Sequence, residues 1–173
     1  MIVLIILLIV KSLLFVLEAI GIFKLAKKNE IKMPILCFLP FATPYYLGLV
    51  AEKRETNEKK RNLKLWLIIL FLLMLLLAVV FAITGFISAN EIIENAKICI
   101  ANDTKMTLDM FSSAIYAIIF YFVSLFTALS YKILRLAAFW KIVSNKNPKK
   151  SGLYMILSAV LYPLMPIFIL INS

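Results

Sequence analysis

An apolar stretch over residues 33–50 constrains this chain most, because it is hydrophobic enough to enter a bilayer yet contains Pro34, Pro40, Pro44 and Gly48. Proline inside a helix removes a backbone hydrogen bond and clashes with the preceding turn. Broken backbone in hydrocarbon must be satisfied by protein or water. We therefore expect a re-entrant or interfacial hairpin here. The alternative is an ordinary spanning helix that is kinked at its prolines.

The rest of the chain is typical of an all-α polytopic membrane protein. Of its 173 residues, 64% are hydrophobic, whereas soluble domains have about 45–50%. Apolar runs of about 20 residues are long enough to cross a bilayer as helices. We predict a single membrane domain over 1–173 with four full spans, at about 1–22, 65–88, 108–131 and 152–171.

The charge pattern predicts how these spans are oriented. The net charge is +10, and the connections 23–33, 51–64 and 132–151 are rich in Lys and Arg, whereas 89–107 holds only two lysines. Basic connections stay in the cytoplasm. We therefore expect 89–107 outside, the N-terminus outside, and 33–50 returning to the side from which it enters.

The same charge pattern suggests partners. Basic residues beside apolar segments indicate contact with the anionic headgroups of the lipid bilayer, and we do not expect nucleic-acid binding. Within 89–107, residues 91–98 have the spacing of a short surface helix. Residues 132–141 look like a continuation of the preceding span into the headgroup region.

Lys11 and Glu18 are the two charged residues well inside a predicted span. A charge at mid-membrane costs about 2.5–3.5 kcal/mol on insertion scales, so such residues suggest a functional site. Seven residues of helix, two turns, separate them, which is too far for a direct pair. In the alternative, Glu18 pairs with Lys24 or another interfacial lysine, and Lys11 extends towards the headgroups.

Other residues suggest structural roles. Small and hydroxylated residues at helical spacing on 108–131 are typical of close helix packing, and aromatic residues near the ends of apolar segments are typical interfacial anchors. The packing residues are Ser113, Ala117, Ser124 and Thr127, and the anchors are Tyr45, Tyr46, Trp66, Trp140 and Tyr154.

No residues suggest catalysis. The chain has no histidine and only Cys37 and Cys99 as thiols, so the commonest metal ligand and general base are missing. We find no glycine-rich phosphate loop, no metal-ligand spacing and no nucleophile paired with a base. We therefore expect no enzyme activity, no catalytic residue, no bound metal and no cofactor.

Two parts of the sequence resemble each other weakly. Phe23-Lys24-Leu25-Ala26 precedes a lysine-rich turn and an apolar run with Pro40 and Pro44, and Trp140-Lys141-Ile142-Val143 precedes a similar turn and run with Pro163 and Pro166. Internal repeats are common in transporters. The alternative is that basic, aromatic helix ends simply suit a cytoplasmic interface.

A second resemblance concerns residues 27–48. A basic turn leads into Leu39-Pro40-Phe41, then Tyr45, then Leu47-Gly48. This segment resembles a group of small, largely uncharacterised bacterial integral membrane proteins. Cys37-Phe38 stands where that group often has tryptophan, and Thr43-Pro44 where it often has asparagine. The resemblance implies a bacterial cytoplasmic (inner) membrane and no particular activity.

These observations lead to two functional hypotheses. The first is a non-enzymatic accessory, scaffold or immunity-type protein that contacts another membrane protein or itself. It rests on nearly charge-free spans with packing stripes. The alternative is a small transporter or channel subunit that works as a homo-oligomer through Glu18 and Lys11.

Overall fold

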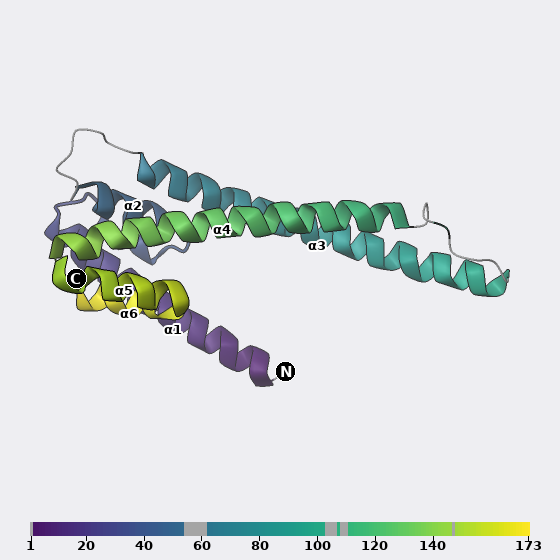
Figure 1. Cartoon of the computed structure of the whole chain (residues 1–173), viewed down its shortest axis with the longest axis horizontal. Helices are drawn as coiled ribbons and strands as arrows, with labels where there is room; N and C mark the ends of the chain where they lie inside the picture. Colours follow the sequence, from purple (N-terminus) through teal and green to yellow (C-terminus); the bar gives the residue numbers. More distant parts are fainter. Residues whose placement is uncertain (1, 54–61, 103–106, 108–110, 147) are drawn as a thin grey trace. The chain divides into compact units, whose positions relative to one another are not determined.

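The structure, a computed structural model, describes residues 2–53, 62–102, 107, 111–146 and 148–173. Within these ranges the secondary structure is entirely helical (Figure 1). The elements are α1 (Ile2–Lys28), η1 (Pro34–Phe38), α2 (Thr43–Lys53), α3 (Leu63–Ala101), α4 (Ser112–Lys146), α5 (Pro148–Val160), η3 (Tyr162–Leu164) and α6 (Met165–Ile171).

The chain divides into two compact units. Unit 1 comprises Met1–Phe71 and Tyr131–Ser173, and unit 2 comprises Leu72–Ser130. The helices α3 and α4 contribute residues to both units. The two units are described separately below.

Three of the described helices, α1, α3 and α4, are long and apolar enough to cross a membrane. Four full spans are not confirmed, because the predicted span 152–171 is not one helix. It is divided into α5, η3 and α6, and the 13 residues of α5 are fewer than a crossing needs. Pro163 and Pro166 lie where the helix is interrupted, as expected from the backbone hydrogen bonds that proline removes.

The stretch 33–50 is also broken. The helices η1 and α2 are joined by a turn, and the Thr43 hydroxyl lies 2.8 Å from the carbonyl oxygen of Cys37. Before η1, Met33 has a left-handed backbone with φ of 52°, which is unusual for a residue with a side chain. The hydroxyl of Tyr46 donates to the Met33 carbonyl at 2.8 Å. This bond ties α2 to the chain that enters η1.

The two ends of this broken stretch lie side by side. The Lys53 ammonium, at the end of α2, donates to the carbonyl oxygen of Asn29 at 2.8 Å. Nearby, a carboxylate oxygen of Glu52 accepts the backbone N–H of Lys64 at 2.9 Å. An acid in this position satisfies a free N–H group at the start of α3. The segment between α1 and α3 therefore doubles back on itself.

The second broken stretch has the same form. The rings of Tyr154 on α5 and Phe168 on α6 are 4.8 Å apart, so the two short helices contact each other (Figure 1). The ammonium of Lys146 donates to the carbonyl oxygen of Ser173 at 3.1 Å. The segment after α4 therefore also returns to the place where it began. We call these two segments the first hairpin (33–53) and the second hairpin (148–171).

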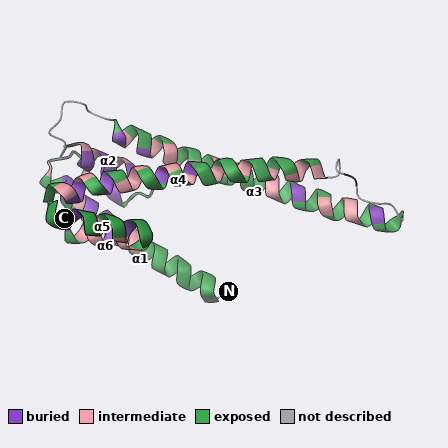
Figure 2. Ribbon diagram, in the orientation of Figure 1, coloured by how far each residue is buried: buried purple, intermediate pink, exposed green. Residues whose placement is uncertain are grey.

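Both hairpins pack on the second half of α1. Figure 2 shows that buried residues of α1 are confined to that half, and α1 contacts η1, α2 and α6. A Cβ added to Gly21 would lie 3.0 Å from the backbone nitrogen of Leu170, so glycine permits α6 to approach α1 closely. The buried residues of this stripe are Glu18, Ala19, Gly21, Ile22, Leu25 and Ala26.

Unit 2 holds the remaining parts of α3 and α4. Their rings meet at Phe81 and Tyr121, with centroids 5.6 Å apart. Here α3 continues without interruption to Ala101, so most of the predicted outer connection 89–107 is helix rather than a separate surface helix. No proline interrupts residues 86–101. Residues 103–106 and 108–110, where that connection ends and the next span was predicted to begin, lie outside the described part.

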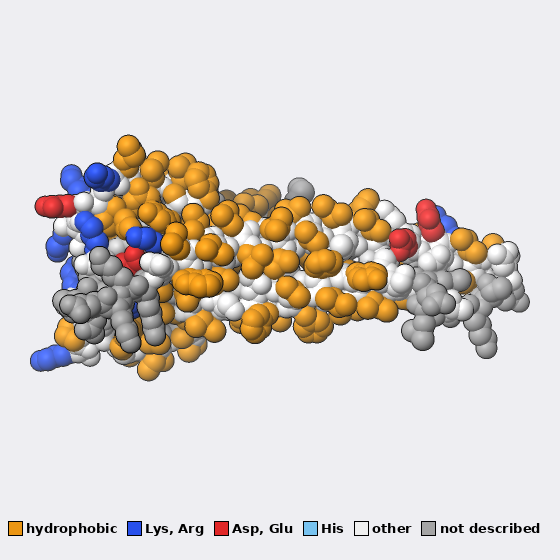
Figure 3. All heavy atoms as spheres, turned by 90° about the horizontal axis from the view of Figure 1, so that it is seen from above, with side chains coloured by type: hydrophobic (Ala, Val, Ile, Leu, Met, Phe, Trp, Pro, Cys, Tyr) orange, Lys and Arg blue, Asp and Glu red, His pale blue; other side chains and the backbone are white. Residues whose placement is uncertain are grey.

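Charge is distributed unevenly. Every described Lys and Arg except Lys97 belongs to unit 1. Figure 3 shows many of these side chains gathered at one end of that unit, next to a broad hydrophobic surface. The first half of α1 exposes large apolar side chains from Val3 to Val10, which is the surface that lipid covers in a membrane protein.

Candidate functional site

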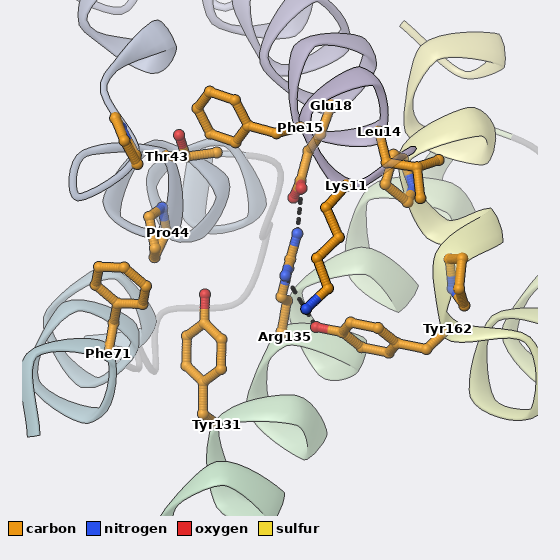
Figure 4. Close-up of a pocket in the computed structure, with 13 residues that line it drawn as sticks. Lys11, Leu14, Phe15, Glu18, Thr43, Pro44, Phe71, Tyr131, Arg135 and Tyr162 are labelled. Atoms are coloured by element: carbon orange, nitrogen blue, oxygen red, sulfur yellow. Dashed lines mark hydrogen bonds and ion pairs between the residues drawn. The ribbon is translucent and has the colours of Figure 1, made fainter. Parts of the chain in front are cut away.

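The centre of unit 1 is an ion pair between α1 and α4. A carboxylate oxygen of Glu18 accepts a hydrogen bond from the Arg135 guanidinium (Figure 4). The Glu18 residue is 3% exposed, and the Arg135 side chain is 18% exposed. Each charge is costly to bury alone, and the pair offsets part of that cost through attraction in a medium of low dielectric constant.

Tyr162 holds the other side of the guanidinium. A second nitrogen of Arg135 donates to the Tyr162 hydroxyl at 2.9 Å. The guanidinium carbon also lies 5.4 Å from the centre of the Tyr162 ring, and the Lys132 ammonium lies 5.6 Å from the same ring centre. Cations are attracted to aromatic faces at such distances. Because Tyr162 begins η3, the break in the second hairpin is what positions this ring.

These groups form one wall of a pocket of about 400 Å³ (Figure 4). All 13 lining residues belong to unit 1. Most of the lining is apolar, and the charged groups are concentrated around the ion pair, an arrangement typical of small-molecule sites. The lining residues are Lys11, Leu14, Phe15, Glu18, Pro40, Thr43, Pro44, Phe71, Tyr131, Arg135, Tyr162, Pro163 and Pro166.

Both hairpins contribute prolines to this pocket. Pro40 and Pro44 come from the first hairpin, and Pro163 and Pro166 come from the second. The two broken segments therefore meet the same cavity, beside α1 and α4. Pro34 and Gly48, the other residues predicted to shape the first hairpin, do not line it. A Cβ on Gly48 would lie 2.5 Å from the Lys64 Cα, so this glycine serves the contact between α2 and α3.

The ion pair joins matching positions of the two sequences that resemble each other. Glu18 lies five residues before Phe23, and Arg135 lies five residues before Trp140. Phe23 and Trp140 begin the two matching sequences described above. Aligning these two similar sequences places an acid on α1 opposite a base on α4, and these two residues contact each other.

Two polar groups in the pocket have no partner among the described residues. One is the second carboxylate oxygen of Glu18, Oε1, which is buried and makes no hydrogen bond. The other is the ammonium of Lys11, for which the described residues provide no hydrogen bond or ion pair. Figure 4 shows the Lys11 side chain extending towards Arg135 and Tyr162. Lys11 and Glu18, predicted as a polar site, therefore line the same pocket, and neither bonds the other.

The predicted anchors have different environments. Trp66 is 58% exposed, Trp140 is 36% exposed, and Tyr45 and Tyr154 are partly exposed. Tyr46 is instead buried, with its hydroxyl bonded to the chain before η1. In unit 2, Thr127 is buried, and the other three residues predicted to pack, Ser113, Ala117 and Ser124, are partly exposed.

Sequence reasoning missed Arg135 and Tyr162. Arg135 was assigned to the headgroup region because lysines and Trp140 follow it closely. A signal was present nonetheless, since the repeat places Arg135 opposite Glu18. Tyr162 adjoins Pro163, and its position depends on how the second hairpin is broken, which no local pattern reveals.

Comparison with known proteins gives no match. No protein-family model matches it, and no curated protein or solved structure matches it either. Among the residues that the structure describes, no group of three or more His, Cys, Asp or Glu side chains is placed to hold a metal ion.

Proposed function

We propose that this chain is a small, non-enzymatic carrier of the bacterial cytoplasmic membrane that binds an amphiphilic solute in the pocket beside Glu18 and Arg135. In this proposal α1, α3 and α4 cross the membrane, and the N-terminus lies outside. The two hairpins enter from the cytoplasmic side and return to it.

The hydrogen bonds at the hairpin ends support this placement. Lys53 bonds the Asn29 carbonyl, and Lys146 bonds the Ser173 carbonyl, so each hairpin begins and ends at one place. Both places are rich in lysine, and lysine-rich connections stay in the cytoplasm. A segment that crossed the membrane once would instead have its two ends about 30 Å apart.

The observation that carries the proposal is the position of the pocket. It lies where two proline-broken hairpins meet two repeat-related helices. Transporters built from repeats place their substrate sites at the repeat interface, where broken helices line a cavity. The helices α1 and α4 are proposed to run in the same direction across the membrane, which makes this a parallel repeat.

The competing proposal is an accessory role with another membrane protein. The observation that favours it is that Glu18 and Arg135 already pair with each other, so the pair also suits a purely structural clamp between α1 and α4. The earlier idea of a pore between several copies has less support, because the partner of Glu18 belongs to the same chain.

Photocrosslinking tests the carrier proposal. The purified protein in detergent is irradiated with a diazirine-bearing long-chain alcohol, an uncharged amphiphile, and the labelled peptides are identified by mass spectrometry. Leu14→Trp adds a large side chain to the pocket lining. Leu13→Trp is the matched control, because Leu13 is 62% exposed and does not line the pocket.

The two proposals predict different labelling. A binding pocket gives labelled residues on α1 and both hairpins, and Leu14→Trp removes this labelling whereas Leu13→Trp retains it. A structural clamp without a ligand site gives labelling only on exposed apolar surfaces, with no difference between the two variants. That second result contradicts the carrier proposal.

A further inference from the structure

We infer that the ligand carries a primary ammonium next to a phosphate, as in the phosphoethanolamine head group of a phospholipid. This inference rests on the proposed function, and it adds the chemical class of the ligand. Two groups that line the pocket have no partner among the described residues, and they suit partners of opposite charge.

Glu18 requires a hydrogen-bond donor. Its Oε1 is buried and without a partner among the described residues, while the other carboxylate oxygen is bonded to Arg135. Leaving a buried acceptor of this kind unpaired is costly. The Arg135 guanidinium bonds the other carboxylate oxygen of Glu18 through one terminal nitrogen and Tyr162 through the second, and neither bond reaches Oε1. A ligand that brings an N–H donor into the pocket satisfies this oxygen.

Lys11, at the mouth of the pocket, can donate to an acceptor. Its ammonium has three N–H groups, and no described residue accepts a hydrogen bond from it. It lines the pocket together with Glu18 and extends towards Arg135 (Figure 4). A phosphate oxygen placed there would interact with one full positive charge and lie close to a second.

The charges of the site favour a zwitterion over a simple ion. A lone anion would satisfy Lys11 but leave Oε1 of Glu18 unpaired. A lone cation would satisfy Glu18 but be repelled by Lys11 and Arg135. A head group with an ammonium at one end and a phosphate at the other satisfies both groups, and it adds no net charge to the membrane interior.

The rest of the pocket suits the apolar part of such a ligand. Leu14, Phe15 and Phe71 line it together with the four prolines. Lys11, Pro40 and Pro163 are exposed, so the pocket opens to the surface of unit 1. In the proposed membrane placement that surface contacts lipid, which allows acyl chains to extend outwards while the head group stays inside.

Native mass spectrometry of the protein in detergent tests this inference with three lipids of equal chain length. Phosphatidylethanolamine has the ammonium and the phosphate, phosphatidylcholine has no N–H donor, and phosphatidylglycerol has no cation. We expect phosphatidylethanolamine to bind about tenfold or more tightly than the other two, since charged hydrogen bonds are lost with each of them. Lys11→Met weakens the binding of all three lipids, because Lys11 meets the phosphate that they share, whereas Lys24→Met, outside the pocket, does not.

The outcomes separate this inference from the proposed function. If the three lipids bind equally and Leu14→Trp abolishes their binding, the head-group assignment is wrong and the pocket remains a ligand site. Binding that Leu14→Trp does not affect overturns both. Free phosphoethanolamine is added as a competitor: displacement of the lipid indicates that the head group alone is recognised, and failure to displace it indicates that the ligand is the intact lipid.

Discussion

Glu18 on α1 and Arg135 on α4 form a buried ion pair, and each lies five residues before an aromatic residue that is followed by lysine. The pair therefore joins the two helices at matching positions of two similar sequences. Each of these sequences is followed by a hairpin that is broken by prolines and that returns to a lysine-rich end. This arrangement creates the pocket on which the proposed function depends.

The close contact between α1 and α6 is the first feature to test. Gly21→Ala is expected to destabilise the protein by about 1–3 kcal/mol, as overpacking does elsewhere, because the new Cβ would lie 2.9 Å from the Ile169 side chain and 3.0 Å from the Leu170 backbone. Thermal unfolding in detergent measures the effect.

Gly85→Ala is the matched control for this substitution. No atom lies within 4 Å of a Cβ added at Gly85, so alanine there gains helix propensity of up to about 1 kcal/mol. Equal effects of the two substitutions would show that α6 does not pack against α1 as described.

The thiol of Cys37 offers a test of the first hairpin. Cys37 is fully buried, and burial raises its pKa to about 12. Reaction with a maleimide requires an accessible thiolate. At pH 8 we expect Cys37 to react more slowly than an exposed cysteine by a factor on the order of a hundred or greater. The exposed cysteine for comparison is introduced by Phe41→Cys in a Cys37→Ser background. Fast labelling of Cys37 in the folded protein would contradict the fold of this hairpin.

The same shift predicts the direction of a pH effect. The folded-state pKa lies above the ordinary value of 9.0, so the folded protein holds the proton more strongly than the unfolded chain does. The contribution of Cys37 to stability is therefore complete below pH 9 and is lost as the pH rises towards 12. In Cys37→Ser the thiol is absent, so the free energy of unfolding falls less between pH 9 and pH 12 than in the unaltered protein. Unfolding curves at several pH values measure this difference.

The membrane placement is tested in intact cells with a membrane-impermeant thiol reagent. Single cysteines at Lys28, Lys53 and Lys149, in a background without Cys37 and Cys99, are expected to be protected, and one at Asn90 is expected to be labelled. Lys28 and Lys53 flank the first hairpin. If only one of these two is labelled, the hairpin crosses the membrane and the proposed topology is wrong.

Part of this architecture follows from the sequence. The cost of charge in hydrocarbon singled out Lys11 and Glu18, and the prolines predicted a broken stretch at 33–50. The prediction of a full span over 152–171 from its hydropathy was not confirmed, because an apolar stretch that folds back on itself has the same hydropathy as one that crosses the membrane. Arg135 was missed because a basic residue near a helix end usually extends into the headgroups. The similar sequences around Glu18 and Arg135 align the two residues, and the contact between them, which joins residues far apart in the chain, reveals the role of Arg135.

Exchanging the charges of the central pair tests the account most directly. Glu18→Arg and Arg135→Glu, each alone, place two like charges together in a buried site. Breaking a buried pair costs about 3–5 kcal/mol, and we expect the free energy of unfolding of each single variant to fall by at least that much. We also expect each single variant to lose the labelling of the pocket. Glu18→Gln and Arg135→Gln serve as neutral comparisons.

The measurement is the thermal stability and the photocrosslinking of the double variant, in which Glu18→Arg and Arg135→Glu are combined. If the two residues contact each other and form the base of the pocket, the double variant recovers most of the stability and of the labelling by the uncharged probe that the single variants lose. A double variant no better than the worse single variant, or single variants that behave like the unaltered protein, would contradict the account.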